Sequence, residues 1–214
     1  MGTLRRLAGT ARRAWGWIFE VKGGLMLAVA ARQAPAVEQA MPVPGFTEIT
    51  THGDDAVLSA APVARRRDQG HVLYAIVEEG NVRAYGWVSG AGLEVQVLHA
   101  MTFTVPPRCL YIWDCLTVPG ERNRGRYKAL LRGMLATLPQ TGTAYVAVDL
   151  GNAPSRRALE RVGFRPLFRY YGMKLFGRPV LGLAYHSGRI EPAQRAFDKL
   201  EADIGGTAAG HGGR

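Results

Sequence analysis

The stretch from Leu110 to Leu138 constrains the fold more than any other part of the sequence. It opens with a dense apolar run up to Val118, which predicts a buried strand. It ends with apolar residues at helical spacing, which predict an amphipathic helix that Pro139 terminates. These helix positions are Tyr127, Leu130, Leu131, Met134, Leu135 and Leu138. A short turn, with two glycines and several arginines, therefore connects a strand directly to a helix.

The turn at residues 119–126 has the chemistry of an anion site. The first N–H groups of a helix lack partners within the helix, and the helix dipole is positive at that end. Gly125 allows close backbone approach, and the side chains of Arg122, Arg124 and Arg126 add positive charge. A pyrophosphate fits such a site. The alternative is a plain basic turn in contact with solvent.

Two segments of the chain resemble the sequence motifs of the GNAT N-acetyltransferases. The acyl-CoA motif of this family is a strand ending in L-x-V, a turn, and Q/R-x-x-G-x-G/A at the start of a helix. Here residues 116–118 read LTV and residues 122–127 read RNRGRY, so Tyr127 replaces the usual Gly or Ala. The family's second motif, N-x-x-S/A followed by a GF pair, is similar to residues 152–164, NAPSRRALERVGF.

The resemblance covers roughly residues 46–185 and implies an α/β (α+β) fold. The expected GNAT fold is a mixed, mostly antiparallel sheet flanked by helices, with its central strands splayed apart. Acetyl-CoA, or another acyl-CoA, is the implied co-substrate, with its pantetheine arm in the splay. The residues implied to bind it are Leu116, Val118, Arg122, Arg124, Gly125, Arg126, Tyr127, Asn152 and Ser155. Asn152 has an alternative role as the N-cap of the following helix.

The implied reaction is transfer of an acyl group, most simply acetyl, to an amine by direct attack in a ternary complex. The implied acceptor is a small-molecule or peptide amine, and a backbone amide near Val118 is expected to polarise the carbonyl. Asp114 is the candidate base, because burial in an apolar strand would raise its pKa. An Asp bonded to the backbone or to a neighbouring arginine is the alternative. Glu78, Glu79 and His99 are weaker candidates.

The usual general acid of the family is missing from this sequence. Many members carry a Tyr four residues before the Gly of the GF pair, where this chain has Leu159. Tyr127, Tyr170, Tyr171 or water would then protonate the departing thiolate. Two further functions stay open: an acyltransferase that uses longer acyl-CoA or acyl carrier protein at a membrane surface, and a non-catalytic acyl-CoA-binding or scaffold domain.

Composition limits the partners of this chain. The formal net charge of +10 over 214 residues requires an anionic partner, and CoA explains part of it. Nucleic acid is not expected, because the basic residues do not alternate with exposed aromatic residues. The five histidines lack ligand spacing, so no metal is expected. Cys109 and Cys115 would lie about 20 Å apart on one strand, too far to pair. Unpaired thiols suit a reducing, cytoplasmic location.

We expect three regions along the chain. Residues 1–43 form a basic amphipathic N-terminal extension and linker, residues 44–190 the acyltransferase domain, and residues 191–214 a short helix and a disordered Gly-rich tail. Residues 3–20 predict a helix that either contacts a membrane interface or packs on the domain or on a partner subunit of a homodimer. Gly23 and Gly24 are expected to end that helix, and the sequence through Pro44 to form a connector.

Elsewhere the pattern predicts strands at 46–51, 71–77, 82–88, 93–104, 145–149, 164–176 and 180–186. It predicts helices over 54–65, 152–163 and 191–203. Arg65–Arg67 is expected to be a solvated helix end, where cations suit the dipole.

Overall fold

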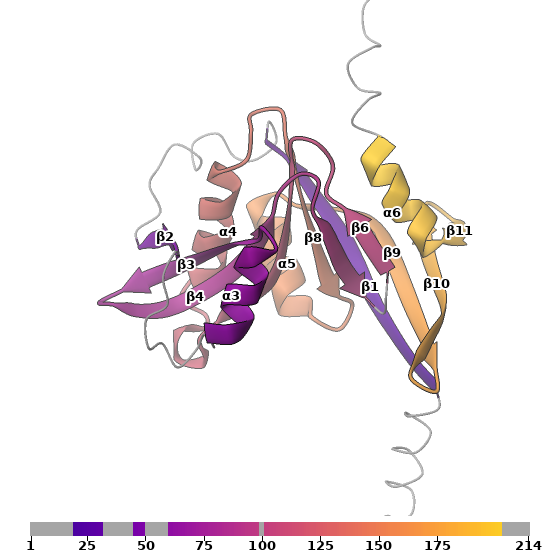
Figure 1. The fold of residues 1–214 in the computed structure, drawn as a ribbon, viewed down its shortest axis with the longest axis horizontal. Coiled ribbons are helices and arrows are strands. Elements are labelled where there is room, and N and C mark those ends of the chain that lie inside the picture. The colour runs from indigo at the N-terminus through magenta and orange to yellow at the C-terminus, as the bar shows by residue number, and fades with distance from the viewer. Residues whose placement is uncertain (1–18, 32–44, 50–59, 99–100, 203–214) are drawn as a thin grey trace, which may run out of the picture.

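The fold is described here from a computed structural model, which describes residues 19–31, 45–49, 60–98 and 101–202 (Figure 1). Its large sheet contains β1 (Phe19–Ala30), β2 (Phe46–Glu48), β3 (Val72–Glu78), β4 (Asn81–Ser89), β7 (Cys109–Thr117), β8 (Thr143–Asp149), β9 (Arg165–Leu175), β10 (Arg178–His186) and β11 (Arg189–Pro192). The strand order is β11-β10-β9-β1-β8-β7-β4-β3-β2. Every neighbouring pair is antiparallel except β7 and β8, which are parallel.

Helices cover both faces of this sheet. They are α3 (Ala60–Asp68), α4 (Arg126–Ala136), α5 (Ala153–Val162) and α6 (Ala193–Ala202), and a hairpin of β5 (Glu94–Leu98) and β6 (Met101–Thr104) lies beside them. One core joins α4 and α5 to one face of the sheet. On the opposite face, α3 covers β3 and β4, while α6 and the β5–β6 hairpin cover the β1–β9–β10 side. The expected fold class, a mostly antiparallel sheet flanked by helices, is confirmed.

The two parallel strands separate part-way along their length. β7 pairs with β8 only from Cys109–Thr143 to Ile112–Val146, although β7 continues to Thr117. The expected splay of the central strands is therefore present. It opens toward the carboxyl ends of both strands, directly before the turn into α4.

The segment that we expected to be a connector is a strand in the middle of the sheet. β1 pairs with β8 on one side and with β9 on the other. Gly23 and Gly24 lie opposite Tyr171 and Tyr170, and a Cβ on Gly24 would lie 2.3 Å from the Tyr170 hydroxyl oxygen. The two glycines leave room for two aromatic rings, one on each face. The connector prediction is therefore wrong for residues 23–30, and the helix prediction is wrong for Phe19 and Glu20, which begin β1.

Other element boundaries differ less from the predictions. The strand expected over 93–104 is the β5–β6 pair, and β11 begins just before the expected C-terminal helix. The expected helix at 54–65 is observed as α3, and residues 50–59 lie outside the described part. So do residues 3–18 of the predicted amphipathic helix, His99 and the Gly-rich tail. No described helix has the length and apolar content needed to cross a bilayer.

Candidate active site

The start of α4 has an open backbone turn. β7 leads through Val118 into a short 3-10 turn, Pro119–Glu121, and Gly125 precedes the helix in the left-handed conformation, with φ 78°. No side chain in the described ranges caps this helix start. A Cβ built on Gly120 or Gly125 would meet no heavy atom within 4 Å, so both glycines face open space. The turn therefore has unpaired helix donors and room for an anion.

Two of the three expected arginines of this turn already contact carboxylates. Arg126 forms a two-pronged ion pair with Glu78, with Nη2 to Oε2 at 2.6 Å. Its Nε lies 3.4 Å from Oε2 of Glu121, and Nη1 of Arg124 lies 3.5 Å from Oε1 of the same carboxylate. Arg83 approaches Glu121 as well, at 3.6 Å. The turn is less positive than its arginine count suggests, although Arg122 and Arg124 are both exposed.

Val118 also differs from its expected role. Its N–H donates to the carbonyl oxygen of Arg83 at 3.1 Å, so this amide is already used next to the pairing of β7 with β4. An amide committed to this bond does not point at a ligand. The expectation that the Val118 amide contacts the acyl-CoA is therefore wrong, whereas the amides of residues 124–127 lie in the open turn.

Tyr127 connects α4 to α5. Its ring packs against the core, and its hydroxyl accepts a hydrogen bond from the Ser155 hydroxyl at 3.1 Å. Burial, followed by the charge of Cys115, raises the pKa of the Tyr127 hydroxyl. The Asn152 side chain accepts the Ser155 N–H at 3.1 Å, which confirms its N-cap role. Leu159, at the family Tyr position, is fully buried.

A β-bulge lies on β7 where the splay begins. Asp114 and Cys115 both face Gly86 of β4, and Asp114 has a φ of 44°. The extra residue turns the Asp114 side chain toward α3, where it forms an ion pair with Arg66. The side chain is 43% exposed, so the burial predicted for Asp114 is wrong and the alternative of an arginine partner is present. Burial instead raises the pKa of Cys115 to about 12.

The Arg66 guanidinium packs against two aromatic rings instead of being surrounded by solvent. Its guanidinium carbon lies 4.6 Å from the ring centre of Trp113 and 5.2 Å from that of Trp87. The Trp113 indole N–H donates to the Ser89 hydroxyl at 2.8 Å, and that hydroxyl lies 3.0 Å from Nδ1 of His71. Burial and the charge of Arg66 lower the pKa of His71. The prediction that Arg66 is a solvated helix end is wrong.

Residues 41–164, more than half of the chain, match the family model described as the acetyltransferase (GNAT) family. The chain belongs to the GNAT acetyltransferase family. GNAT members use acetyl-CoA as co-substrate, which agrees with an open turn next to a splay. No curated protein matches this sequence.

Several solved GNAT structures are similar to this chain. A GNAT-family protein from Novosphingobium aromaticivorans has 17% identity and a TM-score of 0.42, over 71% of this chain and 63% of that one. A GNAT-family acetyltransferase from Colwellia psychrerythraea has 13% identity and a TM-score of 0.49, over 73% of this chain and 57% of that one. A third protein, from Sphaerobacter thermophilus, has 17% identity and a TM-score of 0.44, over 81% of this chain and 58% of that one. The chain thus spans 57–63% of the length of these proteins.

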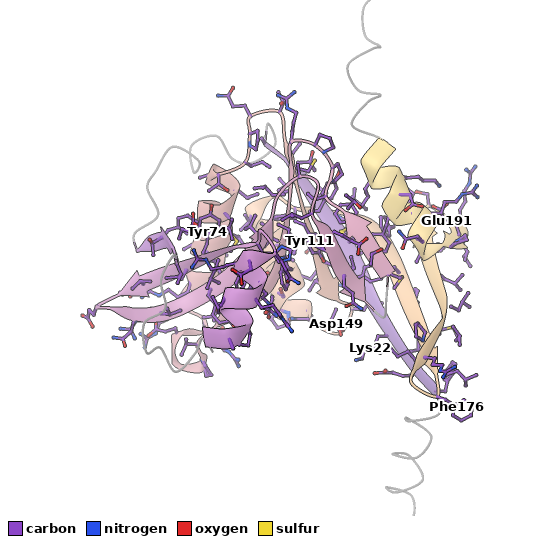
Figure 2. The ribbon with its side chains drawn as sticks, viewed as in Figure 1. Lys22, Tyr74, Tyr111, Asp149, Phe176 and Glu191 are labelled. Carbon is purple, nitrogen blue, oxygen red and sulfur yellow. The ribbon has the colours of Figure 1, made fainter. Side chains whose placement is uncertain are left out.

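The two tyrosines proposed as general acids in this GNAT chain do not share one site. Tyr170 is buried, and its hydroxyl lies over Gly24 of β1. Burial, followed by the charge of Asp149 at the end of β8 (Figure 2), raises the pKa of Tyr170. Tyr171 lies over Gly23 on the opposite face, because neighbouring strand residues alternate. Tyr170 therefore lies on the same face of the sheet as the Asp114 side chain, and Tyr171 lies on the opposite face.

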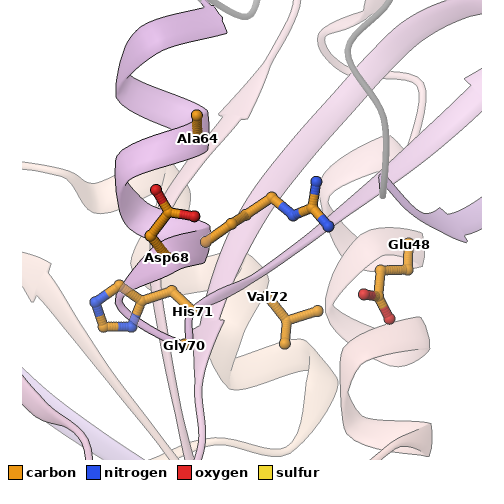
Figure 3. A pocket seen from close by; sticks show the side chains of 7 residues that line it. Glu48, Ala64, Asp68, Gly70, His71 and Val72 are labelled. Carbon is orange, nitrogen blue, oxygen red and sulfur yellow. The ribbon is translucent and has the colours of Figure 1, made fainter.

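A hollow of about 420 Å³ lies beside α3 (Figure 3). It is lined by Glu48, Ala64, Arg67, Asp68, Gly70, His71 and Val72. None of these residues belongs to β7, β8, α4 or α5, so the hollow is distinct from the splay. The ring of His71, one of the lining residues, meets Trp113 edge-on at 5.2 Å between ring centres. Within the described ranges, no group of three or more potential metal ligands is found.

Proposed function

We propose that this GNAT domain transfers an acetyl group from acetyl-CoA to an amine by direct attack in a ternary complex. One observation carries the proposal, which is that three features follow one another along β7. The pairing with β8 ends at Ile112, the bulge at Asp114 comes next, and the strand then enters the open turn before α4. A thioester ligand would meet an unpaired strand edge, a carboxylate and an anion site in that order.

Backbone groups supply most of the proposed acyl-CoA contacts. The pyrophosphate would lie at the amides of Arg124, Gly125, Arg126 and Tyr127. The pantetheine arm, which contains two amides, would run along the edge of β7 beyond Ile112, past Leu116, as a peptide adds to a sheet edge. The same unpaired edge would polarise the thioester carbonyl. Asn152 and Ser155 would border the arm from the first turn of α5.

Asp114 is the proposed base. The amine nitrogen would attack the thioester carbon and lose a proton to Asp114, while the C–S bond breaks and CoA leaves as a thiolate. Tyr170 or water would give the thiolate its proton. Because Asp114 is paired with Arg66, accepting a proton would weaken that ion pair.

The test combines binding with turnover. Calorimetric titration with acetyl-CoA should give measurable heat and raise the melting temperature, and CoA thiol should appear in the presence of an accepted amine. Heat and melting shift without thiol release over a broad amine panel would favour the non-catalytic acyl-CoA-binding or scaffold function, which the buried Leu159 also favours. Absence of both binding and release would refute the proposal.

Acyl transfer at a membrane surface is a second candidate, favoured by an apolar face on β1, β9 and β10. By strand register, Phe19 lies opposite Leu175, and Val21 opposite Met173, which in turn lies opposite Leu181. These side chains therefore share the face of the sheet that carries α5. Phe19, Val21, Leu175 and Leu181 are each 40–50% exposed. Contiguous exposed apolar surface of this kind marks a contact surface.

Charge favours an anionic lipid as the partner of this apolar face. The basic residues of β1 and β9–β11 are Lys22, Arg165, Arg169, Lys174, Arg178 and Arg189, and the acidic ones are Glu20 and Glu191. A second copy of the chain would bring like charges together, whereas an anionic bilayer attracts them. Figure 2 labels Phe176, at the tip of the β9–β10 hairpin, and Lys22 of β1 toward the same end of the sheet. In the sequence, the basic segment 3–18 directly precedes Phe19.

Vesicle sedimentation tests this second candidate. The full chain should bind vesicles that contain phosphatidylglycerol and not vesicles of phosphatidylcholine alone, and binding should weaken with salt. Val21→Ser with Leu181→Ser should reduce binding, whereas Val21→Leu should retain it. Long-chain acyl-CoA should then be the better donor. Equal binding to both vesicle types, or a dimer that buries the face, would contradict it. Cys109 and Cys115, both free thiols, suit the cytoplasmic side of such a membrane.

A further inference from the structure

We infer that the acceptor is a small zwitterion of the amino-acid class, whose carboxylate binds Arg66 while its amine reaches Asp114. The inference rests on the proposed function and adds the chemical class of the acceptor. Four observations support it: the place of the Arg66–Asp114 pair, the aromatic support of Arg66, the partial exposure of both side chains, and the charges that a ligand must satisfy.

The Arg66–Asp114 pair lies where an acceptor must approach the thioester. Asp114 follows Ile112, the last β7 residue paired with β8, by two positions. The bulge turns its carboxylate away from α4 and toward α3. An acyl-CoA that enters from the start of α4 would therefore meet its acceptor from the α3 face. The Arg66–Asp114 ion pair lies on that side of the bulge.

Arg66 is fixed in position more firmly than a surface arginine needs to be. The guanidinium lies over two indole rings, of which Trp87 is fully buried and Trp113 is fixed by its bond to Ser89. An exposed ion pair contributes little to stability, so Asp114 alone does not explain this support. A guanidinium that is oriented in advance and weakly hydrated is well suited to bind a carboxylate through two parallel N–H groups.

The exposure of the pair allows exchange with a ligand. Side-chain exposure is 28% for Arg66 and 43% for Asp114, so both can be reached from solvent. An amino acid brings one ammonium and one carboxylate. Its ammonium would pair with Asp114 and its carboxylate with Arg66, and each protein charge would keep a partner. An amine without a carboxylate would draw Asp114 away and leave Arg66 unpaired.

The reaction balances with this arrangement. The ammonium transfers one proton to Asp114, the free amine attacks the thioester carbon, and the C–S bond breaks. CoA leaves as a thiolate and takes a proton from Tyr170 or water, and the second amine proton leaves with solvent as the amide forms. Arg66 transfers no proton and holds the carboxylate throughout, so its role is to position the acceptor.

The first test compares acceptors on the wild-type enzyme. Each amino acid is matched with its primary amide, which lacks the negative charge, and with its decarboxylated amine, and CoA release is followed. The amino acid should have a kcat/KM about 100-fold above both relatives, because an unpaired arginine disfavours them. Equal values for the three would overturn the inference and leave the acetyltransferase proposal intact. No release with any of the three would overturn the inference, and the broad amine panel would then decide the acetyltransferase proposal.

The second test uses variants of α3. Arg66→Gln should raise KM for the amino acid about 30-fold and remove its advantage over the amide. Arg66→Lys, which keeps the charge without the fork, should recover part of the affinity. Arg65→Gln, an exposed arginine on the same helix, is the matched control and should behave as wild type. Acetyl-CoA affinity, measured by calorimetry, should be unchanged in all three.

Binding without turnover gives an independent readout. Displacing Asp114 from Arg66 beside Trp113 should change tryptophan fluorescence when an amino acid is added, and the primary amide should cause no change. If Arg66→Gln lowered the melting temperature and acetyl-CoA affinity together while KM for the amino acid stayed constant, Arg66 would be purely structural. That result would overturn the inference.

Discussion

The two halves of the large sheet reach their structure by different routes. In the half that contains β7, α4, β8 and α5, each element follows its neighbour in sequence, and short turns set their geometry. In the half that contains β1, β9 and β10, the central strand comes from the other end of the chain. Contacts between neighbouring segments of the sequence therefore determine the structure of the first half, whereas contacts between distant segments determine that of the second.

Gly24→Val is expected to have the largest effect. It disrupts the contact of β1 with β9, two strands that are far apart in the sequence and that form the second half of the sheet. The new side chain would occupy the space of the Tyr170 ring, and a Cβ would already lie 2.3 Å from its hydroxyl oxygen. We expect a loss of about 3 kcal/mol in the free energy of unfolding, measured by urea denaturation.

Gly120→Ala is the matched control for this prediction in the first half. Its Cβ would meet no heavy atom within 4 Å, so we expect a change within about 0.5 kcal/mol. Equal stability of the Gly24→Val protein and wild type would mean that β1 does not pair as described.

Asp114→Asn tests the chemistry of the first half. Replacing the proposed base should lower kcat by about 10²- to 10⁴-fold while acetyl-CoA affinity stays the same. Steady-state kinetics and calorimetry give the two numbers. Asp198→Asn on α6, which belongs to the second half, should leave both unchanged. A full rate in the Asp114→Asn protein would leave water as the base.

Glu121→Gln tests whether the carboxylates at the turn oppose the co-substrate. Its side chain is only 11% exposed and lies against Arg83, Arg124 and Arg126. Removing its charge should release positive charge at the turn and tighten acetyl-CoA binding by about 5-fold at low salt. The gain should shrink as salt rises. Weaker binding would mean that Glu121 orders the arginines for the ligand.

The smallest expected effect concerns His71 and pH. Because burial and Arg66 lower its pKa in the folded protein, the unfolded chain binds the proton more tightly. The stability contribution of the neutral ring is complete above the unfolded pKa of about 6.5 and is lost as pH falls toward the lower folded value. His71→Gln should therefore flatten the dependence of melting temperature on pH between about 7 and 5. An unchanged slope would contradict this assignment.

The sequence predicts the first half because its signals are short-range. The apolar run of β7, the helical spacing of α4 and the N-cap at Asn152 each depend on a few neighbouring residues. The splay followed from family resemblance and is present. Site geometry was harder, since the bulge that exposes Asp114 depends on its register against Gly86, which the residues of β7 do not encode.

The wrong predictions have related causes. The local sequence predicts that Gly23 and Gly24 end a helix, because the tyrosines that fill the space beside them lie far along the chain. Arg66 read as solvated because its aromatic partners lie on two other strands. The arginines of the turn were counted without Glu78 and Glu121, although both acids were visible in the sequence.

The position of β1 has a consequence for synthesis of the protein. Among the described strands β1 is made first, whereas the two strands that enclose it, β8 and β9, follow much later in the sequence. Until then the apolar run Leu25–Val29 has no native partner, and long-range pairing of this kind is slow to form. A nascent chain arrested before β8 would therefore expose that run, and we expect such chains to be clients of ribosome-associated chaperones.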